Sequence, residues 1–284
     1  IQSNCTLTAS ATINKYTVSY TKNANIASIS KTSESVNYGG TATCTATLPA
    51  NTAQYTYTFA GWYEGSTQVG TALALSVANI TAARTFEARG TATVNRYTIT
   101  VNNGSGGGTY NYGTKVTLTA STIKGKTFSK WSDGVTTASR EITVTANATY
   151  TAKYTTNIYT VTYVRGTGVN ALTKTTEQVV YNGSVTSDTA VASTGYNTPT
   201  WTKTSGTGTL TVSAGKATLS AIQSNCTLTA SATINKYTVS PSAYYRNTDG
   251  TGNYTAGTTG GTVSGGGSVN HGGSITVTAS AAAG

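Results

Sequence analysis

The 284-residue sequence is poor in charge and in the residue types that most active sites use. Charged residues make up 9% of it, against about 25% in ordinary soluble domains. There is one histidine, and the eight carboxylates form no close pair in the sequence. These counts argue against a Ser-His-Asp triad, a two-carboxylate glycosidase and a metal centre. We therefore expect no catalytic, cofactor-binding or metal-binding residue, and we predict that the chain is not an enzyme.

Other absences limit the class of protein further. No apolar run reaches 18 residues, so the sequence predicts no membrane span. The net charge is +10, but the 18 lysines and arginines are scattered, whereas a nucleic-acid binder gathers them on one face. We expect no nucleic-acid partner. The charge excess favours either simple solubility or weak attraction to an anionic surface or polysaccharide.

Short runs in which apolar and polar residues alternate make up much of the sequence. Apolar or aromatic residues occupy every second position in stretches such as Tyr97-Thr-Ile-Thr-Val and Tyr159-Thr-Val-Thr-Tyr, which is the period of a half-buried strand. Only three prolines interrupt the chain, and Thr and Tyr suit pleated sheets. The sequence predicts an all-β fold, and no run of helical periodicity is long enough to assign a helix.

Residues 1–19, IQSNCTLTASATINKYTVS, occur again letter for letter at residues 222–240. This duplication belongs to a looser repeat: a Tyr-Thr-Val start, a Gly-containing turn feeding a strand, one tryptophan, and an Asn turn before a closing strand. The only histidine, His271, stands in VNHGG where Tyr38 stands in VNYGG, so we expect a turn residue that packs like that tyrosine.

The repeat boundaries follow from this order of motifs. Residues 1–13 are predicted to be the closing strand of a preceding repeat, and residues 236–284 the first half of a fourth. The complete repeats are predicted at 14–95 (repeat 1), 96–157 (repeat 2) and 158–235 (repeat 3). We expect a piece of a longer tandem array of small β domains, joined by short links into an elongated rod.

The three cysteines fall on inward-facing strand positions. Cys5 and Cys226 occupy one repeat position, at which we align Ile80 and Ala148, so all three cysteines are interpreted as small buried hydrophobes. A Cys5–Cys44 disulfide stays open as an alternative.

Four Asn-x-Ser/Thr sequences precede predicted closing strands. We interpret them as turn residues that tolerate left-handed backbone, with glycosylation as the alternative. They are Asn4, Asn79, Asn147 and Asn225.

The motifs Tyr-Thr-Val-x-Tyr, Tyr-Gly and YTFAGWY resemble the Listeria–Bacteroides repeat of the InlB B-repeat type. Residues 96–154, from RYTITVNNG to TYTAKY, resemble its divergent form. The resemblance implies a β-grasp-like or small all-β unit, repeated in tandem on secreted or surface-anchored bacterial proteins as a stalk or adhesive segment. It brings no catalytic residues.

Two functions remain open on the sequence alone. The first is a non-enzymatic extracellular stalk or surface fibre, whose partners are neighbouring repeats or other copies of the chain through strand addition. The second is an adhesin or carbohydrate-binding module for cell-surface or host glycans. Its rings would be Trp62, Tyr63, Trp131 and Trp201, although one tryptophan per repeat is more typical of a core.

Overall fold

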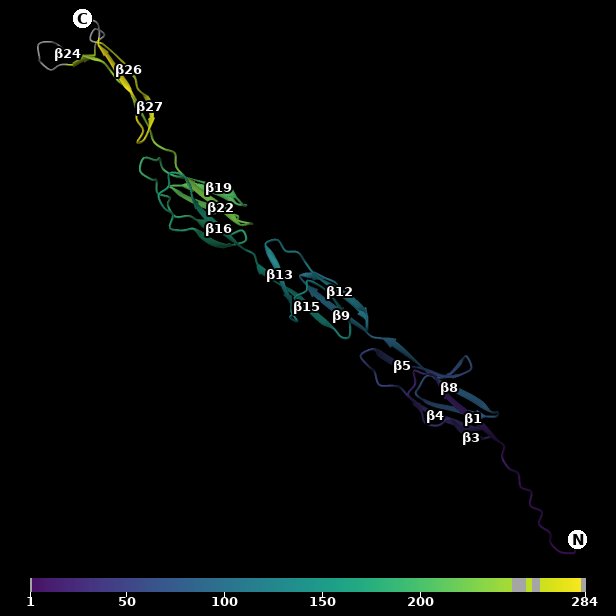
Figure 1. Ribbon diagram of the computed structural model, residues 1–284. Helices are drawn as coiled ribbons and strands as arrows, with labels where there is room; N and C mark the ends of the chain where they lie inside the picture. The colour runs from purple at the N-terminus through teal and green to yellow at the C-terminus, as the bar shows by residue number, and fades with distance from the viewer. Residues whose placement is uncertain (1, 247–253, 257–260, 282–284) are drawn as a thin grey trace. The chain divides into compact units, whose positions relative to one another are not determined.

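A computed structural model describes residues 2–246, 254–256 and 261–281 (Figure 1). All elements in these residues are strands, which confirms the predicted all-β class. Of the two unit types that the resemblance implies, this is the small all-β form, because a β-grasp unit carries a helix against its sheet. The described residues hold no helix of a length and hydropathy that could cross a membrane.

Contacts divide the chain into two compact units, which are described separately. The first is Ile1–Ser121 with Phe128–Lys153, and the second is Thr122–Thr127 with Tyr154–Gly284. The division falls inside repeat 2. The repeat boundaries therefore stay predictions from the sequence, and the repeat numbers below follow them.

Repeat 1 contains a five-stranded sheet in the order β3-β1-β8-β5-β6 and a three-stranded sheet in the order β2-β4-β7. Its strands are β1 Lys15–Lys22, β2 Ser28–Ile29, β3 Ser33–Asn37, β4 Gly40–Thr47, β5 Tyr55–Glu64, β6 Thr67–Gly70, β7 Ala74–Ile80 and β8 Arg84–Val94.

Repeat 2 has the same plan, with sheets in the orders β11-β9-β15-β13 and β10-β12-β14. Its strands are β9 Arg96–Asn102, β10 Gly104–Ser105, β11 Gly108–Asn111, β12 Lys115–Ala120, β13 Lys126–Trp131, β14 Ser139–Thr143 and β15 Ala148–Thr156.

Repeat 3 has sheets in the orders β17-β16-β22-β19 and β18-β21-β20. Its strands are β16 Ile158–Arg165, β17 Thr176–Val180, β18 Val185–Thr186, β19 Thr200–Ser205, β20 Thr209–Ser213, β21 Lys216–Ser220 and β22 Cys226–Ser231. Figure 1 shows β16, β22 and β19 side by side.

One pairing rule unites the three repeats. The first strand pairs antiparallel with the next long hairpin strand and parallel with the closing strand that ends the repeat. The parallel register sets Arg84 opposite Val18, Ala148 opposite Ile99, and Cys226 opposite Val161.

This register corrects the alignment of repeat 1. Arg84, not Ile80, is the counterpart of Cys226, so Asn79 is not the counterpart of Asn225. Asn79 does have left-handed backbone, with φ 60°. Asn147 and Asn225 act instead through their side chains, as their Oδ1 atoms accept hydrogen bonds from the backbone N–H groups of Thr98 (2.7 Å) and Thr160 (2.9 Å).

Each repeat packs around its tryptophan, as predicted. Trp62, Trp131 and Trp201 are 0%, 0% and 3% exposed. Each indole N–H donates to a backbone carbonyl, at 3.1, 3.1 and 2.9 Å respectively. Tyr20 and Tyr163 meet the rings of Trp62 and Trp201 edge-on. The polar atom of a large apolar group is thus satisfied inside the core.

The fourth repeat is described in part. β23 Lys236–Val239 pairs with β27 Gly267–Asn270, as the first hairpin does in the other repeats. β24 Tyr244–Arg246 pairs with β25 Tyr254–Ala256, and β26 Gly261–Gly265 with β28 Val277–Ala281. Of the predicted 236–284 half-repeat, residues 247–253, 257–260 and 282–284 lie outside the described residues.

The closing strand predicted within residues 1–13 is not formed. Residues 2–13 carry no strand and are exposed, and Leu7 is 95% exposed. The identical residues of the second copy form β22, which has a neighbouring strand on each side. The first copy lacks such neighbours in the described structure, and a lone extended segment gains no ladder hydrogen bonds.

Candidate functional site: the junctions between repeats

An asparagine stands directly before the first strand of every repeat. Its backbone carbonyl accepts a hydrogen bond from the backbone N–H of the aromatic turn residue of the same repeat, at 2.8 Å in all four cases. The four pairs are Asn14–Tyr38, Asn95–Tyr112, Asn157–Tyr181 and Asn235–His271.

Three of these asparagines also bond backward, to a loop of the preceding repeat. Asn95 N–H donates to the carbonyl of Gln54 (2.8 Å), Asn157 N–H to that of Gly125 (2.9 Å), and Asn235 N–H to that of Gly195 (2.8 Å). We call the three-residue arrangement of loop carbonyl, asparagine and aromatic turn residue the Asn clasp. Each clasp lies wholly within one compact unit.

The clasp at Asn95 is reinforced by side chains. Its Nδ2 donates to the carbonyls of Thr52 (2.9 Å) and Ala53 (3.1 Å), and its Oδ1 accepts from Thr56 Oγ1 (2.6 Å). Tyr97 OH also donates to the Ala53 carbonyl at 2.7 Å. Asparagine suits this position because one short side chain both donates and accepts.

At Asn157 and Asn235 the loop carbonyl belongs to a glycine, and Asn157 Oδ1 also accepts from Thr127 Oγ1 at 2.7 Å. Gly125 and Gly195 have φ +74° and +81°, and an added Cβ would lie 2.2 Å from the Tyr181 ring and 2.1 Å from the His271 ring. Glycine is required twice over, for the left-handed backbone and for the close approach of the ring. His271 also packs on Tyr237 at 6.0 Å between ring centroids, which confirms its predicted likeness to Tyr38.

Among the contacts described, Asn14 makes only one of the two clasp hydrogen bonds: its carbonyl accepts from the N–H of Tyr38. Asn14 is exposed, whereas Asn95, Asn157 and Asn235 are half-buried. Tyr38 is 56% exposed, although it packs on Tyr16 as Tyr112 packs on Tyr97. The N-terminal face of repeat 1 therefore presents the surface that a preceding loop covers elsewhere.

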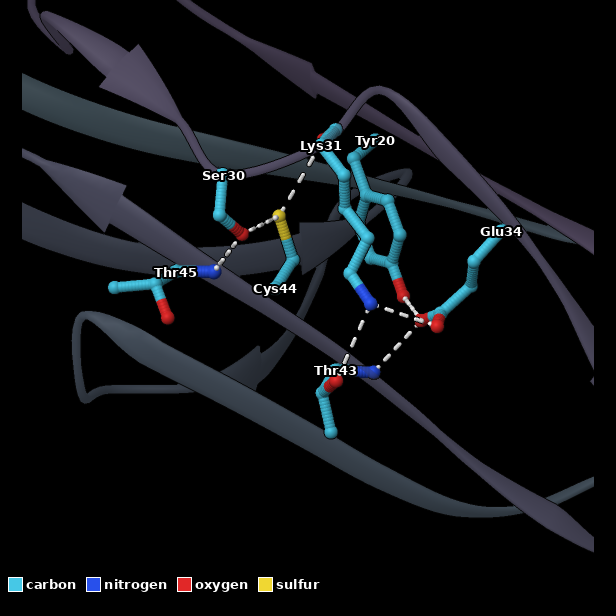
Figure 2. Close-up of polar contacts among 7 residues, drawn as sticks. All are labelled: Tyr20, Ser30, Lys31, Glu34, Thr43, Cys44 and Thr45. Carbon is cyan, nitrogen blue, oxygen red and sulfur yellow. Dashed lines mark hydrogen bonds and ion pairs between the residues drawn. The ribbon is translucent and has the colours of Figure 1, made fainter.

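A polar cluster fastens the first hairpin of repeat 1 to β4 (Figure 2). Glu34 accepts hydrogen bonds from Tyr20 OH, from Lys31 Nζ (2.7 Å) and from the backbone N–H of Thr43 (2.9 Å). At the next position of β4, Cys44 Sγ lies 3.5 Å from both Ser30 Oγ and the Lys31 carbonyl.

Repeat 3 rebuilds the same cluster at the same spacing. Tyr163 OH donates to Glu177 at 3.0 Å, and Lys174 Nζ lies 3.0 Å from the same carboxylate. In repeat 2 the residue opposite Ile99 is Gly108, where repeats 1 and 3 have the glutamate. Repeats 1 and 3 thus share a structural device that repeat 2 lacks.

The electrostatics of these clusters favour fixed ionisation states. Partial burial raises the pKa of Glu34, but hydrogen bonds from Lys31, Tyr20 and the Thr43 N–H outweigh it, so the net pKa is lowered. Burial, and then the carboxylate of Glu34, raise the pKa of Tyr20 well above 10. A carboxylate held this way is a structural anion and a poor proton acceptor. Among the described residues, no three His, Cys, Asp or Glu side chains are grouped as metal ligands.

The rings considered for glycan binding lie mostly inside. Trp62, Trp131 and Trp201 are buried, so stacking on a sugar would require opening the core. Tyr63 is half-buried, and the guanidinium of Arg89 lies 4.4 Å from its ring centroid. The three tryptophans belong to three different repeats, and Tyr63 follows Trp62 in β5.

The cysteines are all reduced. Cys44 and Cys226 are buried as predicted, but Cys5 is exposed because its segment forms no strand. The alternative Cys5–Cys44 disulfide is not present.

Comparison with known proteins gives one family match. Residues 97–158 match the family described as the divergent InlB B-repeat domain, which confirms the resemblance for that stretch. The matched range agrees with repeat 2 to within one residue at each end. No curated protein and no solved structure matches the chain.

Proposed function

We propose that this chain is a non-enzymatic structural segment of an extracellular bacterial surface protein, acting as a stalk or as the repeating part of a surface fibre. The recurrence of the Asn clasp carries this proposal. A segment that holds a binding tip away from a cell must resist bending between its domains, and the clasp ties adjacent repeats at the point where they would bend.

The junctions have almost no slack. β8 ends at Val94 and β9 begins at Arg96, so a single residue, Asn95, separates closing strand from opening strand. Asn157 is likewise the one residue between β15 and β16. One backbone hydrogen bond of each clasp crosses the junction, since the other joins the asparagine to the repeat that it opens. At about 1 kcal/mol, that bond would make an opened junction about fivefold less populated than a closed one.

Other features agree with a structural role at a cell surface. The family matched by residues 97–158 points to bacterial surface-associated proteins. In repeat 1, the Glu34 carboxylate accepts hydrogen bonds from Lys31, Tyr20 and the backbone N–H of Thr43. Both observations favour a structural role over a catalytic one.

Stiffness at the Asn95 junction tests the proposal. Spin labels on Thr45→Cys in β4 and Thr117→Cys in β12, both exposed, would report the distance between repeats 1 and 2 in a Cys5→Ser background. We expect a narrow distance distribution that Asn95→Ala broadens, because that change removes three side-chain hydrogen bonds. Asn14→Ala is the matched control, as it changes the same repeat position where the side chain is exposed.

A broad distribution in the unchanged chain would contradict a stiff stalk. The cellular half of the proposal needs a separate experiment, in which an antibody raised against the chain is applied to intact cells of the source organism. Labelling of unpermeabilised cells is expected, and labelling only after permeabilisation would overturn the extracellular assignment.

A further inference from the structure

Repeats 1 and 3 have loops of equal length after the opening strand, but the two loops fold differently. In both repeats 14 positions separate the tyrosine of the polar cluster from its glutamate. In repeat 1 the loop forms β2, whose residues Ser28 and Ile29 pair with β4. In repeat 3 the corresponding residues, Ala171 and Leu172, form no strand. The correspondence holds because Ile29 and Leu172 both lie two residues before the cluster lysine.

Backbone contacts hold the loop of repeat 3 in a different place. The N–H of Asn170 donates to the carbonyl of Val191 at 2.9 Å. Next to it, Val169 pairs with Ala192 in an antiparallel bridge. The loop is therefore anchored to residues 191–192 and adds no strand to a sheet as β2 does.

A pocket of about 220 Å³ lies between this loop and β16. Its lining residues are Tyr163 and Arg165 of β16 and Ala171, Leu172 and Thr175 of the loop. Tyr163 belongs to the core of repeat 3 and Leu172 packs against that core, so the apolar side of the pocket is fixed. Pockets for drug-sized ligands measure about 300–1,000 Å³, so this one suits a single sugar ring or a molecule of similar size.

The cation at this pocket, Arg165, has no carboxylate partner in the part of the chain that the structure describes. Its Nη1 donates to the backbone carbonyl of Asn170 at 2.7 Å, which holds the guanidinium beside the pocket and leaves its other N–H groups for a ligand. Arg84, Arg89 and Arg140, by contrast, each form an ion pair with an acidic side chain. A guanidinium held in this way presents a fork of donors that matches a carboxylate.

The acidic side chains of the same region already have partners. Glu177 lies 3.0 Å from Lys174 Nζ and accepts a hydrogen bond from Tyr163 OH. Asp188 accepts from Thr173 Oγ1. Neither carboxylate occupies the donors of Arg165.

We propose that this pocket binds a carboxylate-bearing sugar, such as one uronic acid unit of an anionic polysaccharide. The carboxylate accepts from the N–H groups of Arg165, the hydroxyl of Thr175 bonds to a ring hydroxyl, and the C–H face of the ring packs on Leu172. The chain's net charge of +10 attracts a polyanion, which favours an acidic polysaccharide over a peptide with a single terminal carboxylate.

This inference goes beyond the proposed structural role and does not depend on it, because the pocket lies within one repeat. It also differs from the ring-stacking site considered above, since recognition comes from a guanidinium and not from exposed tryptophans.

Titration of the 284-residue chain with sodium glucuronate, followed by ¹H–¹⁵N NMR, tests the binding. We expect shifts confined to the amides of residues 163–175, with a dissociation constant of about 1–10 mM. Glucose, the neutral analogue, should bind at least about tenfold more weakly, because it has no carboxylate for the guanidinium. No shift up to about 50 mM glucuronate would overturn the proposal, since a specific site for one ring would be mostly occupied there.

Variants separate the pocket from general attraction between charges. Arg165→Gln should weaken glucuronate binding by about tenfold or more. Ala171→Phe should weaken it as strongly, because Ala171 is an exposed lining residue and a ring at that position fills the pocket. Lys22→Gln is the matched control and should leave binding unchanged, because Lys22 holds the position of Arg165 in repeat 1, two residues after the cluster tyrosine. Unchanged NMR signals outside residues 163–175 show that each variant is folded.

Two further outcomes would contradict the proposal. Glucuronate binding that Lys22→Gln weakens as much as Arg165→Gln does would show attraction to positive charge alone. N-acetylalanine carries a peptide-type carboxylate without a sugar ring, and tighter binding of N-acetylalanine than of glucuronate would overturn the assignment to a sugar.

Discussion

The two copies of the 19-residue sequence behave alike in one part and differently in another. Their last residues open a strand in both places, β1 and β23, and each strand has an antiparallel partner in its own repeat. Their CTLTAS residues form a buried strand only in the second copy, where β16 and β19 were already supplied by the preceding 60 or so residues. The same sequence therefore forms a strand only where neighbouring strands are present to pair with it.

The difference shows what holds these repeats together. Threonine-rich alternation makes a segment suitable for a sheet, but β-propensity reflects the neighbours that a strand packs against. A closing strand depends on contacts made across a whole repeat. An opening strand depends on one antiparallel partner of its own repeat, β3 for β1 and β27 for β23, so it forms without a closing strand.

Thiol reactivity should separate the two copies most strongly. Cys5 is exposed, while Cys226 is 2% exposed and reacts only when repeat 3 opens. We expect Cys5 to react with a disulfide reagent immediately and Cys226 to react at least about a thousandfold more slowly. Cys44, at 3% exposed, should behave like Cys226. Fast reaction of all three thiols in the folded chain would show that repeat 3 does not hold its closing strand.

Truncating the matched leucines should give the next largest contrast. Leu228 is 0% exposed in the core of repeat 3, so Leu228→Ala should destabilise that repeat by about 2–5 kcal/mol through lost burial and a residual cavity. Leu7→Ala, at 95% exposed, should leave stability unchanged in dilute solution. Urea unfolding followed by intrinsic tryptophan fluorescence measures both, because Trp201 reports on repeat 3 and Trp62 on repeat 1. Equal effects would mean that the first copy is also packed.

Acid should weaken the hairpin that follows the first copy. The folded pKa of Glu34 is lowered from 4.5, so its contribution is present above pH 4.5 and is lost as pH falls through the folded pKa. Glu34→Gln should cost about 1–2 kcal/mol at neutral pH and flatten this acid dependence. Thermal melts of both proteins between pH 7 and about pH 3 check the sign. Lys115–Glu141, an exposed ion pair, supplies the control: Glu141→Gln should change little.

The smallest contrast concerns the asparagine before each closing strand. Asn225→Ala removes the acceptor for Thr160 N–H and should cost about 1 kcal/mol. Asn4→Ala should cost nothing in the monomer, because residues 2–13 are exposed and form no strand. Chemical denaturation resolves a difference of this size. A matching loss at both positions would indicate that Asn4 already has a partner.

Sequence reasoning found the features with a local signature. The strands at the Tyr-Thr motifs, the all-β class and the buried tryptophans followed from alternation and spacing. It misaligned Asn79 because the segment before the closing strand differs in repeat 1 from those in the other repeats. Only the pairing register, with Arg84 opposite Val18, reveals this difference.

Sequence reasoning missed the clasp and the polar cluster, because the residues that form each of them lie far apart in the sequence. An asparagine before each Tyr-Thr was visible, but the loop carbonyls of Gln54, Gly125 and Gly195 carry no side-chain signal. The Tyr–Lys–Glu cluster left a trace that could have been found: Lys-Thr-Ser-Glu at 31–34 recurs as Lys-Thr-Thr-Glu at 174–177, with a tyrosine 11 residues earlier both times.

Small-angle X-ray scattering of the monomer tests the proposed stalk function most directly, because a stalk requires the repeats to form a stiff row. Three and a half repeats of roughly 35 Å each predict a particle of about 120 Å. A compact chain of this length would have a radius of gyration of about 19 Å. A rod-like profile with a radius of gyration well above that figure is the expected result. A value near 19 Å would show that the repeats fold back on one another, and would contradict the stalk.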